Sequence, residues 1–231
     1  MSRMVKGDTD MPALSVAMLT RPESIGGCRT VARVRSHFMT GPTTEPTYSS
    51  NDLAYLRAEY RMLEDLCVDR SDSPEKTRDA IAAGRLPQPT YVLPEGIELF
   101  PPDFFALLDS AGSLAELSNH FTDRHRQAAT AVDIPTSASE HEWTNYLSGL
   151  YGACLRQVTP EAMVAKEQLI WRIETMTAAA RPDDDAWVTE LREAVDALDA
   201  IERPFTDYDR QRWGGTSRDS HITAVREKYL S

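Results

Sequence analysis

The chain has 231 residues, of which 36 are acidic and 25 are basic, so its formal net charge is −11. Because this charge repels phosphate groups, the composition argues against a general nucleic-acid binder and against unaided binding to anionic membranes. Hydrophobic residues make up 41% of the chain, which is enough to bury a core in one large domain or two small ones.

Residues 1–48 are predicted to form a disordered N-terminal segment. They mix Gly, Pro, Thr and Arg, and apolar residues recur in them with neither helical nor strand periodicity. Such a segment has no continuous apolar face to bury. We therefore expect the packed part of the protein to begin at residue 49.

Residues 49–112 predict a small module of short helices with one β-hairpin. Ser50-Asn51 provides good N-cap residues for the first helix. A short helix around residues 62–67 follows. Ser73-Pro74 then starts a third helix, since Ser caps well and Pro is suited to the first helical position. Gly84 is expected to end that helix, because glycine tolerates the left-handed backbone of a helix C-terminus.

The hairpin is the only β signal in the sequence. Residues 90–93 and 97–100 are rich in aromatic and β-branched side chains, and they flank a turn at residues 94–96 that contains Pro and Gly. Pro101-Pro102 then opens another helix, which should end near Gly112. This order of elements places the hairpin between two helices of the module.

Residues 113–231 predict an α-helical domain, so the expected fold class is mainly α. Ser139 opens a helix that is expected to continue through Cys154, and Thr159-Pro160 opens another. Residues 187–201 form the clearest amphipathic helix, because their apolar residues recur on one face. The last helix is expected to start after two glycines with Ser217 as its cap.

The module carries a family resemblance. Leu63-Glu-Asp-Leu66, the Ser73-Pro74 turn, the string from Ile81 to Pro87 and the hairpin resemble, in this order, the winged helix-turn-helix of the MerR and excisionase families. The resemblance implies a second helix that enters the DNA major groove and a wing that contacts the backbone. The residues that would contact DNA or another partner are then Lys76, Arg78, Arg85 and Tyr91.

The local charge favours a different partner. Between Asp52 and Asp103 there are six basic and eleven acidic residues, and Glu75 and Asp79 flank the cations of the supposed recognition helix. Acidic side chains weaken contacts with phosphates. A protein or peptide partner is therefore at least as well suited to this module as DNA, and a homodimer is a further option.

The string from Tyr146 to Leu155 is unusual for a helix. Gly149 and Gly152 would each destabilise a helix interior by about 1 kcal/mol relative to Ala. Close packing of this helix against another helix is one explanation. The alternative is a ligand groove lined by Tyr146, Tyr151 and Cys154.

The C-terminal segment is rich in functional side-chain types. A phosphate or carboxylate site could form where Ser217 starts a helix, because helix N-termini attract anions. The alternative is an ordinary capped helix with arginines on its surface. The residues of this candidate ligand site are Arg210, Arg212, Ser217, Arg218 and His221.

The histidines and cysteines predict no metal site or cofactor. His120 and His125 are five residues apart and so diverge on a helix, and His125 lies on an apolar face. The three cysteines are far apart and odd in number, which predicts reduced thiols. No apolar run approaches the ~20 residues that span a bilayer. We therefore expect a cytoplasmic protein without membrane contact.

From about residue 51 onward the chain also resembles an uncharacterised actinobacterial family of natural product biosynthesis proteins. Gly84-Arg-Leu-Pro87, Tyr91-Val-Leu-Pro94 and Arg203-Pro-Phe205 are among the strings that suggest it. This implies a link to secondary metabolism without a defined chemistry. The leading hypothesis is a non-catalytic binding or regulatory protein that docks a macromolecular partner. The alternatives are a DNA-binding regulator of MerR or excisionase type and an enzyme for a small anionic substrate, with His221 as acid or base.

Overall fold

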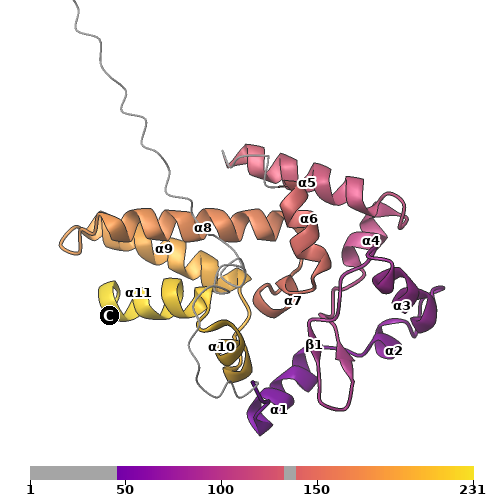
Figure 1. Ribbon diagram of the computed structural model, residues 1–231. Helices are drawn as coiled ribbons and strands as arrows, with labels where there is room; N and C mark the ends of the chain where they lie inside the picture. The colour runs from indigo at the N-terminus through magenta and orange to yellow at the C-terminus, as the bar shows by residue number, and fades with distance from the viewer. Residues whose placement is uncertain (1–45, 133–138) are drawn as a thin grey trace, which may run out of the picture.

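The computed structural model describes residues 46–132 and 139–231, so the prediction for residues 1–48 lies almost wholly outside the described residues. The described part is mainly helical, as predicted (Figure 1). None of its helices is both long enough and apolar enough to cross a bilayer.

The N-terminal module contains the short helices and the hairpin that its sequence predicts. Ser73 caps its third helix, since the Ser73 hydroxyl accepts a hydrogen bond from the Lys76 amide at 3.3 Å. The first helix is capped one residue earlier than predicted, by Ser49. The fourth helix starts well after Pro101-Pro102, at Ala106. The elements are α1 (Ser50–Glu59), α2 (Leu63–Leu66), α3 (Pro74–Ala82), β1 (Tyr91–Val92), β2 (Glu98–Leu99) and α4 (Ala106–Ala111).

The hairpin is joined to the segment between α1 and α2. β1 pairs antiparallel with β2, with Tyr91 opposite Leu99. Arg61 and Phe100 form an additional antiparallel bridge, in which each amide donates to the other carbonyl at 2.9 Å. Leu63 of α2, Ala80 of α3 and Phe100 beside the hairpin also share one buried cluster, so these elements form one small unit.

The rest of the chain is helical. α8 packs against α5 on one side and α9 on the other, and α11 runs beside α9 at the far end from the hairpin (Figure 1). Ile173, Trp187 and Leu191 lie in the core between α8 and α9. The elements are α5 (Leu117–Ala131), α6 (Ser139–Leu147), α7 (Tyr151–Cys154), α8 (Pro160–Ala178), α9 (Asp185–Ile201), α10 (Asp207–Trp213), the π-helical turn η3 (Asp219–Thr223) and α11 (Ala224–Tyr229).

Two predicted details of this domain are wrong. Residues 139–154 do not form one helix, because Gly149 has a φ of +75° and this left-handed conformation separates α6 from α7. Ser217 does not cap the last helical segment. The hydroxyl of Thr216 takes that role by accepting from the Asp219 amide at 3.2 Å.

The two predicted units share an interface with several buried polar contacts. The hydroxyl of Tyr60, which directly follows α1, donates to the Gly152 carbonyl of α7 at 2.9 Å. The Tyr91 hydroxyl of β1 donates to Asp209 of α10 at 3.1 Å. Arg203 donates to Glu59 at the end of α1. The module therefore packs directly on the helical domain.

His125 is a core histidine, as its place on an apolar face suggests. It is 1% exposed, and its Nδ1 lies 2.9 Å from the Ser139 hydroxyl in a hydrogen bond. Burial lowers the pKa of His125 below its usual 6.5, although the negative charges of Glu142 and Glu161 act in the opposite direction. The folded protein therefore holds this imidazole neutral to a lower pH than the unfolded chain does.

A pH dependence of stability follows from this lowered pKa. The contribution of His125 is fully present above the unfolded pKa of 6.5 and declines as pH falls below it, because only the unfolded chain gains a proton there. We expect the free energy of unfolding to fall less between about pH 7.5 and pH 5.5 in H125Q than in the wild type. Urea denaturation at both pH values measures it, and equal changes in the two proteins would contradict the prediction.

Candidate functional site

A groove lies between α3 and α4, with a hollow of about 290 Å³. Its floor is apolar, because Ala80, Leu86, Phe105 and Leu108 are buried there. Two of the predicted partner-binding residues, Lys76 and Arg85, stand on its rim. We call this feature the α3–α4 groove, and its lining residues are Asp72, Lys76, Thr77, Asp79, Ala80, Arg85, Leu86, Phe105, Leu108 and Leu114.

The rim of the α3–α4 groove carries charges of both signs. Lys76 and Arg85 are exposed and form no ion pair with any described residue. Asp72 and Asp79 are also exposed and also lack an ion pair in the described part. The groove therefore combines an apolar floor with two available cations and two available carboxylates, a pattern that suits a polypeptide better than a polyanion.

The structure separates the other two predicted contact residues from this groove. Arg78 is bound by Glu64 at 2.5 Å and Glu98 at 3.3 Å, and the hydrogen bond with Glu64 raises the pKa of the guanidinium. Tyr91 is only 2% exposed and donates to Asp209. The prediction that Tyr91 lies on a docking surface is wrong, because β1 points this side chain into the core between α1 and α10.

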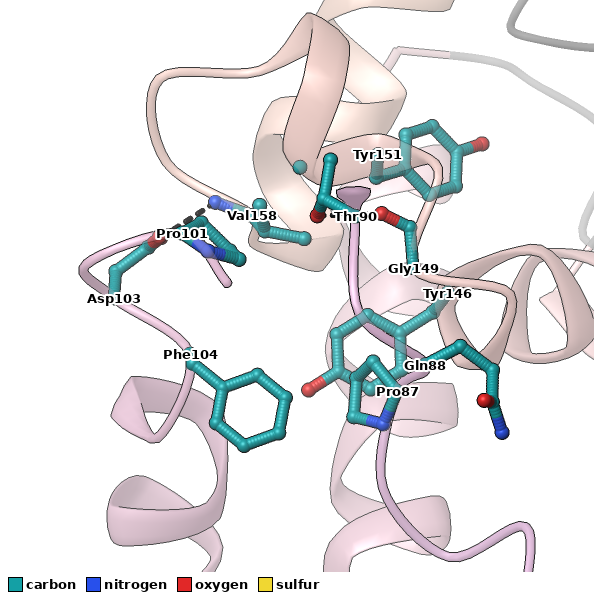
Figure 2. Close-up of a pocket in the computed structure, with 11 residues that line it drawn as sticks. Pro87, Gln88, Thr90, Pro101, Asp103, Phe104, Tyr146, Gly149, Tyr151 and Val158 are labelled. Atoms are coloured by element: carbon teal, nitrogen blue, oxygen red, sulfur yellow. Dashed lines mark hydrogen bonds between the residues drawn. The ribbon is translucent and has the colours of Figure 1, made fainter. Parts of the chain in front are cut away.

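A second hollow lies where the extended segment after α3 meets α6 and α7 (Figure 2). We call it the seam cavity. Tyr146 and Tyr151 are both among its lining residues, as the predicted ligand groove requires, but Cys154 is not. The residues that line it are Pro87, Gln88, Thr90, Pro101, Asp103, Phe104, Tyr146, Gly149, Tyr151, Gly152 and Val158.

The two glycines make the close approach at the seam possible. A Cβ atom at Gly149 would lie 2.1 Å from the Gln88 carbonyl oxygen, and one at Gly152 would lie 2.1 Å from the Thr90 hydroxyl. The Thr90 hydroxyl donates to the Gly149 carbonyl at 3.0 Å. The glycines therefore permit a close approach, as predicted, but the neighbour is the extended segment before β1 rather than another helix.

The seam cavity is narrow and contains an unsatisfied carboxylate oxygen. Its inner space has a volume of about 20 Å³, which is enough for one group the size of a water molecule. Asp103 accepts a hydrogen bond from the Val158 amide through Oδ2 at 2.7 Å (Figure 2). Its Oδ1 is buried and has no partner among the described residues. Burial raises the pKa of the nearby Tyr146, which keeps that phenol neutral.

The C-terminal arginines do not converge on an open anion site. Arg210 binds Asp219 at 3.0 Å, Arg218 binds Asp199 at 2.5 Å, and the Arg212 guanidinium lies 5.3 Å from the centre of the Trp213 ring. Carboxylates thus neutralise Arg210 and Arg218, whereas Arg212 is exposed and contacts the Trp213 ring.

The imidazole of His221 is similarly occupied. Its Nδ1 lies 3.0 Å from the Ser217 carbonyl and its Nε2 lies 3.1 Å from Glu174. Neither of the two hollows described above is lined by Ser217, Arg218 or His221. This arrangement lends no support to a catalytic role for the segment.

The profile of DUF6058, a family of unknown function, matches residues 110–230, which is more than half of the chain. The chain belongs to the DUF6058 family. Searches of curated proteins and of solved structures found no match. The DUF6058 match begins inside α4, close to the predicted boundary at residue 112, so it covers the helical domain and leaves most of the α3–α4 groove outside.

The DUF6058 region contains a buried ion pair that was not predicted from the sequence. Lys166 of α8 and Glu202 at the end of α9 are joined at 2.8 Å, and both side chains are at most 2% exposed. The Ser217 hydroxyl donates to the same Glu202 oxygen at 2.5 Å. One feature of the sequence could have predicted that Lys166 is buried. It lies on the apolar stripe of α8, between Met163 and Ile170.

Within the described residues of this DUF6058 protein, no three His, Cys, Asp or Glu side chains lie close enough together to hold a metal ion. Cys67 and Cys154 are both buried.

Proposed function

We propose that this DUF6058 protein is a non-catalytic binding protein that docks a protein partner in the α3–α4 groove. The single observation that carries the proposal is the apolar floor of this groove beneath two cations, Lys76 and Arg85, that have no ion pair among the described residues. Two other arginines of the module, Arg70 and Arg78, are bound by carboxylates.

The groove is part of a unit that we interpret as winged-helix-like. α2 and α3 are followed by the hairpin, and the Arg61–Phe100 bridge ties the chain before α2 to the end of β2. These features support the resemblance to the MerR and excisionase module. The interpretation differs from a DNA reader in one respect, since the proposed contact surface faces α4 and excludes both Arg78 and Tyr91.

The occupant that we propose is a peptide segment with a large apolar side chain next to an acidic residue. A hollow of about 290 Å³ accommodates one such side chain, and its burial would contribute about 1.5–3 kcal/mol. The acidic residue would pair with Arg85, whose planar guanidinium suits bidentate binding of a carboxylate. Asp72 and Asp79 disfavour a run of phosphates on the same rim.

The test uses peptides selected from a phage-displayed library against the full chain. Enriched peptides should share an apolar residue beside Asp or Glu, and fluorescence anisotropy should show at least about tenfold weaker binding to R85E, because a charge-assisted hydrogen bond is lost. R57E is the matched control, since Arg57 is also an exposed cation, lies on α1 and has no ion pair among the described residues. It should bind as the wild type does.

Several outcomes would contradict the proposal. Equal loss in R57E and R85E would show a general charge effect rather than a groove. Tight, sequence-selective binding of duplex DNA that weakens with salt would favour the regulator alternative. If light scattering shows a homodimer that dissociates in R85E, the occupant of the groove is a second copy of the chain. The link to secondary metabolism rests on the family resemblance alone and remains a proposal.

A further inference from the structure

The seam cavity holds a negative charge without a matching positive one. None of its lining residues is Lys, Arg or His, whereas Asp103 presents an Oδ1 atom that is buried and without a partner in the described part of the chain. The other oxygen of Asp103 is held by the Val158 amide, so the carboxylate is anchored in one orientation. An unsatisfied buried acceptor destabilises a fold, because it has lost its hydrogen bonds with water and gained none in the protein. A group that donates a hydrogen bond to Oδ1 would remove this penalty.

The walls of the cavity favour a cationic donor. Phe104 and Tyr146 present aromatic rings to it, and Pro87 and Pro101 add apolar surface (Figure 2). The electron-rich face of an aromatic ring attracts ammonium groups. A carboxylate beside aromatic rings is therefore a better environment for an ammonium group than for a neutral or anionic one.

We propose that the seam cavity binds the terminal ammonium group of a primary amine, with Asp103 as its hydrogen-bond acceptor and Phe104 and Tyr146 as its aromatic walls. This site is distinct from the α3–α4 groove and does not depend on the function proposed for it. The Val158 amide holds Asp103 in place and so acts as a positioning group.

The size of the cavity sets the selectivity of the site. The inner space of about 20 Å³ admits one group the size of a water molecule, and the wider hollow around it, about 310 Å³ including the part open to solvent, leaves room for a tail. A primary ammonium group fits this inner space, whereas a tetramethylammonium ion is too bulky. The ligand class is therefore an unbranched amine that enters by its charged end.

The glycines give the site a convenient reporter. Gly149 and Gly152 line the cavity, and their position against Gln88 and Thr90 leaves no room for side chains. Their backbone amides should respond to an occupant, because both lie in the wall of the cavity. Amide chemical shifts of these glycines can be followed by NMR in the full chain labelled with ¹⁵N.

The experiment titrates the labelled full chain with methylammonium chloride at constant ionic strength. We expect saturable shifts at Gly149, Gly152 and Val158, and at least about tenfold weaker binding in D103N, which removes the charge and retains an oxygen for the Val158 amide. D109N is the matched control, because Asp109 is an exposed carboxylate of α4 that pairs with Arg70 outside the cavity. It should retain wild-type affinity.

The wild-type protein provides a second test that does not depend on the folding of a variant. Tetramethylammonium has the same charge but exceeds the cavity, and methanol has a similar size to methylammonium but no charge. Neither should produce the saturable shifts. Equal responses to the three probes, or to methylammonium in wild type and D103N, would overturn the proposal. A crystal grown with methylammonium that shows only water beside Asp103 would also overturn it.

Discussion

Replacing Lys166 by methionine should lower the free energy of unfolding by about 3–5 kcal/mol, because the variant leaves the Glu202 carboxylate buried without its cation. Glu202 is 0% exposed, and the remaining hydrogen bond from Ser217 cannot neutralise its charge. Methionine has nearly the length of the lysine stem, so the loss reports charge more than packing. Guanidinium chloride denaturation followed by circular dichroism measures the effect.

The double variant K166M/E202Q is the matched control for this pair. It removes both charges and retains an amide oxygen that can accept from Ser217, so most of the lost stability should return. The two single variants and the double variant form a double-mutant cycle. A K166M variant as stable as the wild type, or a double variant as unstable as K166M, would show that the ion pair has little influence.

Gly149 is the second position where a small change should have a large effect. We expect G149A to lower the free energy of unfolding by about 2–5 kcal/mol, for two reasons. The φ of +75° disfavours any Cβ by about 1–2 kcal/mol. The added methyl would also lie 2.1 Å from the Gln88 carbonyl oxygen, a backbone atom that cannot move without shifting the segment before β1.

Gly214 separates the two contributions. Its φ of +72° nearly equals that of Gly149, but a Cβ there would meet no atom within 4 Å. G214A should therefore lower the free energy of unfolding by only about 1–2 kcal/mol. Urea denaturation of both variants gives the comparison. Equal losses would mean that the close approach at the seam carries no energetic weight.

The seam also connects stability with the proposed amine site. The contact of Gly149 and Gly152 with residues 88–90 forms one wall of the seam cavity. A variant that opens this contact should weaken methylammonium binding as well as the fold. By contrast, Arg85 lies on an exposed rim, so R85E should alter partner binding with little change in stability.

Local sequence signals predicted the helix boundaries well where the partner atoms are close in the chain. Ser73 with Pro74 starts α3, Thr159 with Pro160 starts α8, and the hydroxyl of each cap accepts from an amide three residues later. The same reasoning assigned residues 139–154 to one helix and chose Ser217 as a cap. Both errors arose at positions that contact distant segments. Gly149 lies against the Gln88 backbone at the seam, and the Ser217 hydroxyl donates to Glu202.

The candidate site residues likewise differ in whether their partners are close in the chain or distant from them. Lys76 and Arg85 were identified from their helix, and the structure adds the apolar floor that α4 brings beneath them. Arg210 and Arg218 looked available in the sequence, but Asp219 and Asp199 bind them in the structure. Tyr91 looked like part of a wing, but its partner Asp209 is 118 residues away in the chain.

The sequence by itself determined the helical character of the described chain, the caps of α3 and α8 and the place of the hairpin, because these depend on residue periodicity and on contacts within one helical turn. Only the tertiary structure decided which charges are neutralised and where hollows form. Those properties depend on pairs such as Lys166 with Glu202 and Gly149 with Gln88, whose members are separated by 36 and 61 residues. Packing brings the two members of each pair together, and no local sequence pattern predicts which distant residues will meet.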